Sequence, residues 1–378
     1  MHPLLLILIL IDSFYVYGAT LPRIGMTILL VLLSIAKGIK VSHIQIVIGV
    51  LFMFTFLIGM LNFPDTCLME VKTFIFLGLY SIILRYKWDL NLINTFLLVT
   101  SYLVNFYLLI SILLFFIGVV IDLPFLPESD FVITGESFGF SSSVLQSLAF
   151  YLTFNGVFFI KKKNLLSAIP FMLGIINVIL SQRRAFFIIP SIILLLCYFK
   201  YSNVIKNLPK LIFLSIVIIF SIGFFASFFT DMSAIDYILY NFELLGYDEG
   251  SDGERIIQFN ALWKMFEDSP IWGHGMGAYS TSCIRDVEMP FSYELSVFAL
   301  LIKFGLPIFV FVILAYMRKI CIIFRKNNWI LPMAMGSLSL FLSNMTNPYV
   351  NVSTVLFLIM PFANWNRGES KLIKDNLL

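Results

Sequence analysis

The amino-acid sequence predicts an all-α, polytopic integral membrane protein with about 12 transmembrane helices and one large external loop containing an amphipathic helix. Of its 378 residues, 60% are hydrophobic and only 12% are charged, a balance that no soluble domain could bury. Apolar stretches long enough to span a bilayer recur from end to end. They do not alternate polar and apolar residues, as the strands of a membrane β-barrel would.

The apolar stretches predict the positions of the spans, with ten or eleven spans as alternatives. The first stretch resembles a signal peptide but lacks a basic segment before it, so we expect an uncleaved span. The whole chain, 1–378, is then expected to be a single membrane domain. The predicted spans lie near 3–20, 21–36, 44–62, 70–86, 91–121, 142–160, 164–181, 185–199, 211–229, 292–316, 329–347 and 348–364.

The charged residues predict the orientation, because basic residues favour cytoplasmic segments. With the N-terminus inside, 17 of the 25 Lys and Arg residues fall in internal segments, and 18 of the 22 Asp and Glu residues fall outside. Both termini are therefore predicted to be cytoplasmic, and 230–291 is predicted to be the large external loop. The internal basic residues are Lys37, Lys40, Arg85, Lys87, Lys161, Lys162, Lys163, Lys200, Lys206, Lys210, Arg318, Lys319, Arg325, Lys326, Arg367, Lys371 and Lys374. The acidic residues that do not fall outside are Asp12, Asp89, Glu369 and Asp375.

The external loop is acidic and contains one predicted amphipathic helix at about 252–267. Apolar residues recur along this helix at helical spacing and predict a face that lies on the membrane surface or on the spans. These residues are Ile256, Phe259, Trp263 and Phe266. Arg255 stands at the start of the helix. It is either a solvated surface arginine or an anion ligand beside the free backbone amides of the helix start.

A glycine stands at every second position of Gly273–Gly277, just after the predicted helix. Glycine lets a backbone approach another group closely, so Gly275 and Gly277 are candidates for glycan or backbone contacts. A re-entrant turn that returns the chain to the next span explains the spacing equally well. His274 is the only histidine on the predicted external side, and a histidine in a glycine turn is more often structural than catalytic.

The external arginines are candidate ligands of an anion. Arg183 and Arg184 lie in a tight turn on the predicted outside, where basic residues are disfavoured. Guanidinium groups bind pyrophosphate through paired hydrogen bonds. The alternative is that both side chains snorkel to the interface or pair with loop carboxylates.

Charged and amide residues near the last spans form a further candidate set. Glu294 lies at the external start of one span, beside Tyr293, and Lys303 lies inside the apolar run. Charges within a span are functional hypotheses by default. Alternatively, Glu294 lies at the interface, and Lys303 pairs with Asp12 or snorkels. The last external turn adds side chains that either face a sugar or cap two short helices: Asn344, Asn347, Tyr349 and Asn351.

Motifs for metal or nucleotide chemistry are absent from the sequence. It has no P-loop, HExxH, GxSxG or Cys/His cluster, and the spacing of Asp65 and Glu70 in one short predicted loop does not suggest a metal site. We therefore expect no cofactor, no metal and no nucleic-acid partner. The cysteines are interpreted as free thiols, with a disulfide between Cys67 and Cys283 as the alternative.

Three segments resemble the O-antigen polymerase (Wzy-type) and O-antigen ligase superfamily, and together they cover about residues 180–311. The family's arginine-containing turn and the span after it are similar to LSQRRAFFIIPSIILLL (180–196). Its loop arginine, amphipathic helix and Gly-x-Gly-x-Gly stretch are similar to GERIIQFNALWKMFEDSPIWGHGMGAY (253–279). The span after that loop is similar to SYELSVFALLIKFGLPIFVF (292–311).

The resemblance implies roles for individual residues. By position, Arg183 or Arg184 matches the turn arginine and Arg255 matches the loop arginine, which in the family are implicated in holding a lipid-linked pyrophosphate. Ligases usually carry a His-Asn pair about eleven residues before the glycine that Gly305 matches, and this chain has Glu294 there. This departure argues against a ligase and fits the polymerase branch. Glu294 is then the candidate base, with His274 as its rival.

The resemblance also implies a reaction and a location. The reaction is a metal-independent, inverting transfer of a glycan chain from undecaprenyl pyrophosphate to a lipid-linked repeat unit, on the external face of a bacterial inner membrane. The implied partners are this lipid-linked oligosaccharide and membrane lipid, and a chain-length regulator is left open. The rival interpretations are an O-antigen ligase, a lipid-linked oligosaccharide flippase and a structural membrane protein. A flippase should have a charged central cavity and short external loops, and neither is predicted.

Overall fold

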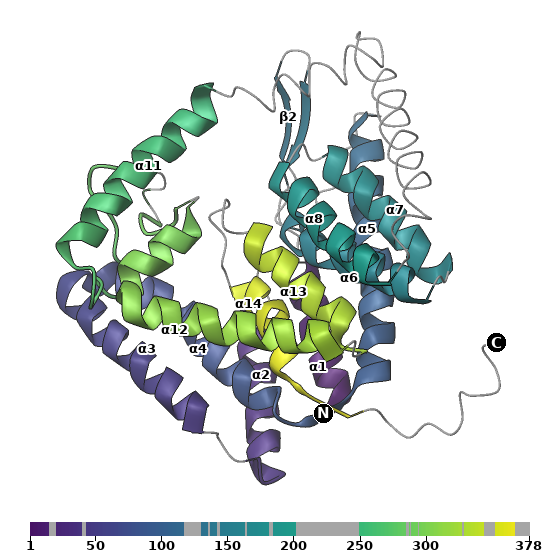
Figure 1. Ribbon diagram of the computed structural model, residues 1–378, viewed down its shortest axis with the longest axis horizontal. Coiled ribbons are helices and arrows are strands. Elements are labelled where there is room, and N and C mark those ends of the chain that lie inside the picture. Colours follow the sequence, from purple (N-terminus) through teal and green to yellow (C-terminus); the bar gives the residue numbers. More distant parts are fainter. Residues whose placement is uncertain are drawn as a thin grey trace.

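The computed structural model describes a helical protein with short strands (Figure 1). The described residues are 1–14, 20–39, 43–116, 130–134, 137–141, 144–162, 165–180, 184–201, 249–284, 287, 289–293, 295–326, 329–343 and 352–366. The helices are α1 (His2–Phe14), α2 (Thr20–Ala36), α3 (His43–Asn62), α4 (Pro64–Ile83), α5 (Leu90–Phe116), α6 (Leu145–Lys162), α7 (Leu165–Leu180), α8 (Arg184–Tyr201), α11 (Glu249–Asp268), α12 (Ser296–Lys326), α13 (Leu331–Ser343) and α14 (Val352–Ile359). A 3-10 helix at Met360–Phe362 follows α14.

Among the described residues, four helices are long and apolar enough to cross a membrane, namely α3, α4, α5 and α12. The other apolar helices are shorter, and a straight span needs about 20 residues. These helices are consistent with the predicted all-α membrane protein. The count of 12 spans stays a prediction, because the predicted span at 211–229 lies outside the described residues.

The start of α4 and the end of α12 differ clearly from the predicted spans. α4 begins at Pro64 instead of near residue 70, so Asp65 and Glu70 lie on a helix and not in a loop. Proline favours the first position of a helix, and an acidic residue in the first turn complements the helix dipole. α12 continues to Lys326, past its predicted end at 316, and its last turn is basic.

The strands are short and join segments that are distant in sequence. β1 (Lys87–Asp89) pairs in parallel with β4 (Asn364–Asn366), and Trp88 stands opposite Trp365 in the register. β2 (Asp130–Thr134) and β3 (Ser137–Ser141) form an antiparallel hairpin. Strands of three to five residues leave little hydrophobic pattern, which explains why the apolar stretches did not predict them.

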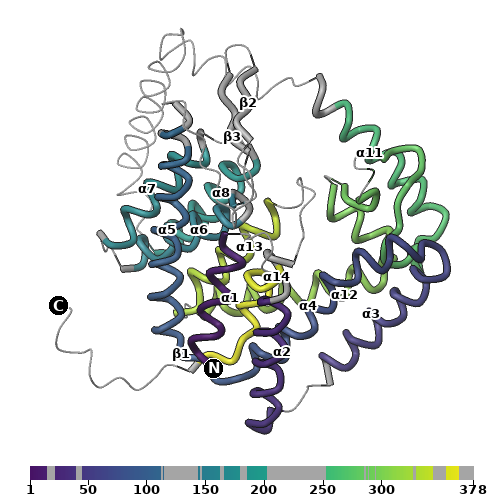
Figure 2. Tube along the Cα trace, turned by 180° about the vertical axis from the view of Figure 1, so that it is seen from behind, coloured from purple at the N-terminus to yellow at the C-terminus, as the bar shows by residue number. Residues whose placement is uncertain are grey.

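The core lies around α6, which packs against α7, α8 and α13. Aromatic rings fill it, with Phe357 of α14 lying 4.8 Å from Phe150 between ring centroids. Amide side chains also join the helices, since the side-chain N–H of Asn177 donates to Asn105 Oδ1 at 3.0 Å. Such bonds hold apolar helices together where no water competes. Figures 1 and 2 show α5 to α8 on one side of the molecule and α3, α11 and the start of α12 on the other.

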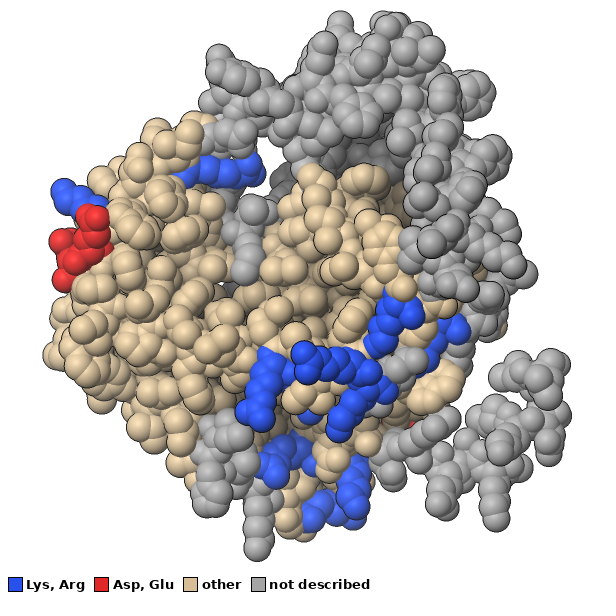
Figure 3. Space-filling view, in the orientation of Figure 1, with Lys and Arg blue, Asp and Glu red and all other residues tan. Residues whose placement is uncertain are grey.

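Basic side chains gather on one part of the described surface. Figure 3 shows them over the lower part of the molecule, where the C-terminal part of α12 lies, while most of the surface around α3 is uncharged. Four basic residues lie in the C-terminal part of α12, namely Arg318, Lys319, Arg325 and Lys326. All four were predicted to be internal from the charge pattern.

Candidate functional site

The predicted external helix is present as α11, which packs on the start of α12. Its Leu262 is fully buried and forms a cluster with Tyr293, Ala299 and Ile302. One turn earlier, Gln258 is also buried. The face that contacts the protein is therefore the one that carries Gln258 and Leu262.

Most of the predicted apolar face of α11 points away from the protein. Phe266 packs against the Leu262 cluster, but Ile256 is 62% exposed and Trp263 is 41% exposed. Phe259 is partly exposed and keeps an edge contact with Phe298 of α12. Lipid is as apolar as a protein core, so the hydrophobic pattern alone could not decide whether this stripe contacts the protein.

Arg255 is at the head of the buried stripe of α11. It lies three residues before Gln258 and seven before Leu262, a spacing that places all three on one face. The arginine is half-buried and lies about 10 Å along the helix axis from Leu262, at 1.5 Å per residue. Lys264, the other basic residue of α11, is exposed. Arg255 is therefore turned toward α12 and the segment before it.

α12 is interrupted at Gly305, where φ is 71° and ψ is 164°. Two residues later, Pro307 has no N–H, so the carbonyl of Lys303 has no donor within the helix. The N–H of Gly275 donates to this carbonyl instead, at 3.1 Å. The loop after α11 thus supplies a hydrogen bond that α12 cannot make within itself.

Two further hydrogen bonds between the loop and α12 pair other backbone groups at this interruption. The N–H of His274 donates to the carbonyl of Ile302 at 2.8 Å, and the N–H of Leu306 donates to the carbonyl of Pro270 at 2.8 Å. Buried backbone groups in membrane proteins must be paired in this way. We refer to residues 273–277 as the glycine strap.

The glycine strap also lies against the hairpin of α3 and α4. Its three glycines all have positive φ, 68° at Gly273, 87° at Gly275 and 78° at Gly277. A Cβ atom on Gly275 would overlap the backbone of Gly59, and one on Gly277 would overlap the backbone of Cys67. Only glycine combines this conformation with so close an approach.

Hydrogen bonds fix the strap in this position. The N–H of Met276 donates to the carbonyl of Thr55 in α3 at 3.1 Å. The hydroxyl of Thr66 in α4 donates to the carbonyl of Gly277 at 2.8 Å. The glycines therefore contact backbone of the same chain: Gly275 and Gly277 are buried against α3 and α4, and Gly273 is buried against the interruption of α12.

His274 is held by the same loop. Its Nε2 atom lies 2.6 Å from the carbonyl oxygen of Met265, and a carbonyl can only accept, so Nε2 carries the proton and donates. The half-buried ring thus ties the strap to the last turns of α11. This arrangement favours a structural role for His274.

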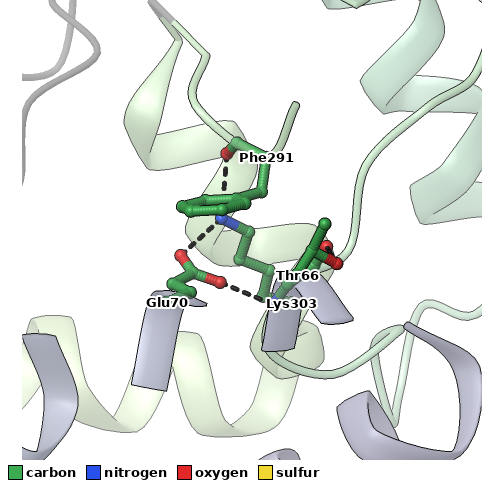
Figure 4. A network of polar contacts seen from close by, with 5 residues as sticks. Thr66, Glu70, Phe291 and Lys303 are labelled. Atoms are coloured by element: carbon green, nitrogen blue, oxygen red, sulfur yellow. Dashed lines mark hydrogen bonds and ion pairs between the residues drawn. The ribbon is translucent and has the colours of Figure 1, made fainter. Parts of the chain in front are cut away.

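An ion pair between Glu70 of α4 and Lys303 of α12 lies next to the strap (Figure 4). The Nζ atom of Lys303 is 2.6 Å from Glu70 Oε1, and it also donates to the carbonyl of Phe291 at 3.2 Å. Glu70 Oε2 accepts the N–H of Gly277 at 2.6 Å. The side chains are only 4% and 12% exposed. One buried pair thus joins α4, the strap, α12 and the segment before α12.

The ion pair borders a small pocket of about 70 Å³, which is partly open to the surroundings. Residues on both sides of Glu294 line this pocket, namely Tyr293 and Ser296. Tyr293 and Ala299 also contact Leu262 of α11, so α11 lies behind one wall. The remaining lining residues are Thr73, Phe74, Phe291, Ser292 and Leu300.

The Tyr293 side chain is a hydrogen-bonding group of this pocket. Its hydroxyl oxygen accepts the N–H of Ser280 at 2.6 Å. Burial raises the pKa of Tyr293 to about 12, so the phenol keeps its proton at neutral pH. It can donate a hydrogen bond to a ligand but cannot act as a base there.

Several predicted site residues lie outside the described part of the chain. These are Glu294, Arg183 and Asn347, and the side chain of Arg184, the first residue of α8, is also not described. The predicted alternative of a Lys303–Asp12 pair is wrong, because Asp12 pairs with Arg23 at 3.0 Å. Among the described residues no group of three His, Cys, Asp or Glu side chains could hold a metal ion.

Glu70 is a site residue that the sequence pattern did not indicate. Its spacing from Asp65 was relevant only to a metal site, whereas the structure makes Glu70 the partner of Lys303. A usable signal was present, because a charge inside a span requires a partner. Glu70 is one of few acidic residues near the predicted external ends of the spans.

The fold and the site thus define a class, a protein of apolar, membrane-type helices in which the loop after α11 is bonded to the interruption of α12 beside a polar pocket. Residues 169–313 match the model of a family described as O-antigen ligase. This match confirms the resemblance to the O-antigen polymerase and ligase superfamily. It covers less than half of the chain and includes Arg255 and Lys303 but not Glu70. No curated protein and no solved structure matches the chain.

The superfamily gives the coarse function. Its members are glycosyltransferase-like enzymes that act on lipid-linked sugars, so a lipid-linked oligosaccharide and membrane lipid are the implied partners. The match does not distinguish a polymerase from a ligase.

Proposed function

We propose that the protein is a polysaccharide polymerase of the O-antigen type. It would transfer a glycan chain from undecaprenyl pyrophosphate to a new lipid-linked repeat unit on the external face of the membrane. The basic side chains at the end of α12 (Figure 3) support this orientation, because they are expected to face the cytoplasm. The pocket at the other end of α12 would then face outward.

We favour a polymerase over a ligase because of one sequence position, Glu294, which lies just before α12. Where ligases of the superfamily carry a His-Asn pair, the sequence here reads Tyr293-Glu294. The comparison is counted back from Gly305, and this glycine has a clear structural role because α12 is interrupted there. Tyr293 and Ser296 both line the pocket, which supports a site at Glu294.

The proposed reaction requires one proton transfer and one charged leaving group. An acceptor hydroxyl attacks the anomeric carbon of the donor, a new C–O bond forms, and the bond to the pyrophosphate breaks. The bonding electron pair leaves with the lipid pyrophosphate. Glu294 accepts the hydroxyl proton, and because a carboxylate is a weak base for an alcohol, proton transfer follows most of the C–O bond formation.

Guanidinium groups would stabilise the charge that grows on the pyrophosphate. Arg255, Arg183 and Arg184 are the proposed ligands, since paired N–H donors match phosphate oxygens. Arg255 is half-buried on the inward face of α11, and this position supports its proposed role as a pyrophosphate ligand. Removing one preorganised donor typically lowers a rate by about 10²–10³-fold.

The function is tested in a strain that lacks the gene, by separating its surface glycan on a gel. A polymerase predicts a single repeat unit on the acceptor and no ladder of longer chains. Loss of every repeat unit would instead indicate a ligase or a flippase. A normal ladder would contradict all three.

Arg255 is tested by complementing that strain with Arg255→Ala and Arg255→Lys. Both are expected to lose long chains at normal protein levels, the lysine variant because it keeps the charge but not the paired donors. Lys264→Ala is the matched control, since it removes an exposed cation from the same helix. Long chains from Arg255→Ala would remove this arginine from the mechanism.

A further inference from the structure

We propose that the pocket beside the Glu70–Lys303 pair is a subsite for one neutral sugar residue, the terminal sugar of the acceptor repeat unit. The assignment of this sugar to the acceptor rests on the proposed function. The existence of a sugar site does not, because it follows from the lining of the pocket. Nothing in the family match concerns Glu70, which lies outside the matched residues.

The lining combines two kinds of surface that a pyranose ring requires. Phe74 and Phe291 provide aromatic rings, on which the C–H faces of a sugar can stack. Thr73, Tyr293 and Lys303 provide polar groups around them. Sites for small ligands are generally lined by apolar and aromatic side chains with a few placed polar groups, and the lining here has this composition.

The polar groups of the pocket have donors and acceptors beyond those used in the hydrogen bonds described above. An ammonium group has three N–H donors, and Lys303 directs two of them to Glu70 and Phe291. The Tyr293 oxygen accepts from Ser280, which leaves the phenol hydrogen to donate. Glu70 has further lone pairs for a sugar hydroxyl.

The charge of the pocket selects a neutral ligand. Lys303 and Glu70 lie 2.6 Å apart and neutralise each other, so the pocket presents no surplus positive charge to a phosphate or a carboxylate. A sugar acid would also bring its carboxylate close to Glu70. Like charges at such distances are strongly disfavoured in a buried site.

The neutral lining also separates the acceptor from the donor. The reacting sugar of the donor carries the pyrophosphate and must lie beside arginines. The attacking end of the acceptor carries no phosphate and must lie beside the base. Tyr293 and Ser296, which flank the proposed base in sequence, line this pocket, which supports assigning the pocket to the acceptor.

The site is tested by binding, with purified protein in lipid nanodiscs and saturation-transfer NMR. The probes are the methyl glycosides of glucose, galactose, N-acetylglucosamine and rhamnose, and of glucuronic acid as the anionic counterpart. We expect at least one neutral glycoside to bind and the glucuronide not to bind. Thr73→Trp fills the pocket and should abolish the signal. Ile75→Trp adds bulk to the same helix at an exposed position outside the pocket lining and should leave it unchanged.

A second variant covers the case in which Thr73→Trp does not fold. Phe291→Leu removes one ring and should weaken binding about tenfold, the factor that corresponds to 1.4 kcal/mol. Failure of every glycoside to bind, or binding that survives both variants, would overturn the subsite. If binding is lost as expected while deletion of the gene leaves the glycan ladder intact, the subsite stands and the polymerase function falls. If binding and the ladder are both lost in Thr73→Trp, the acceptor assignment stands.

Discussion

At the scale of single residues, the Glu70–Lys303 pair is the most consequential contact. Its two charges are almost fully removed from solvent and are joined by further hydrogen bonds to Gly277 and Phe291. Burying such a pair costs desolvation energy that the geometry must offset. The main effect of the pair is therefore to fix where the strap and the segment before α12 lie, and its net contribution to the free energy of unfolding is expected to be small.

Lys303→Met is expected to destabilise the protein by about 3–5 kcal/mol, because it leaves the Glu70 carboxylate buried without its counter-charge. The double variant Glu70→Gln/Lys303→Met should recover part of this loss. The measurement is the free energy of unfolding in detergent, followed by denaturant titration. Lys72→Met, at an exposed position of α4, is the control. Equal stability of Lys303→Met and wild type would show that the pair is not a structural link.

The sequence could predict one half of this pair but not the other. Lys303 was recognisable as a charge within an apolar run. Glu294 was recognisable because it lies in a segment, 292–311, that resembles the superfamily. The partner of Lys303 is 233 residues away in sequence, and no local pattern relates two such positions. Asp12 was an equally reasonable candidate until the fold showed it against Arg23.

At the scale of elements, the glycine strap depends on backbone conformation and not on side-chain chemistry. Gly275→Ala is expected to lower the melting temperature and to abolish activity, because a Cβ atom there overlaps Gly59 and φ is +87°. Gly253→Ala in α11 is the control, since nothing lies within 4 Å of its Cβ position. That change should stabilise the helix by up to about 1 kcal/mol. A Gly275→Ala protein with wild-type stability would contradict the role of the strap.

Element positions were predictable where hydrophobic length alone decides them. The predicted spans at 21–36 and 44–62 agree closely with α2 and α3. The start of α4 was missed because Pro64 and Asp65 are typical of loops as well as of a first helical turn. The end of α12 was missed because Arg318 and Lys319 are typical of a membrane boundary, although a helix can continue beyond it.

At the scale of the whole molecule, the orientation can be tested through Cys283, which follows the strap. In a Cys321→Ser background the other two cysteines are buried, so a membrane-impermeant maleimide should label Cys283 in intact spheroplasts. Labelling only after permeabilisation would reverse the predicted orientation.

The same reagent gives a pH dependence with a definite sign. Burial, and then the negative charge of Glu254, raise the pKa of the Cys283 thiol. Less thiolate is therefore present at pH 8 than for an exposed cysteine, and the labelling rate should keep rising at higher pH. Glu254→Gln should lower the pKa and speed labelling at pH 8. An unchanged rate in this variant would show that Glu254 does not act on the thiol.

The interruption of α12 has a consequence for the order in which the protein is assembled. The order of the elements along the chain places α3 and α4 before the predicted external loop, and this loop before α12. The carbonyls of Ile302 and Lys303 depend on loop amides, and an unpaired carbonyl in hydrocarbon costs several kcal/mol. In the predicted orientation, the loop would therefore have to cross the membrane and dock on the hairpin of α3 and α4 before α12 reaches its final position. Insertion of this late span would then depend on correct translocation of the loop that precedes it.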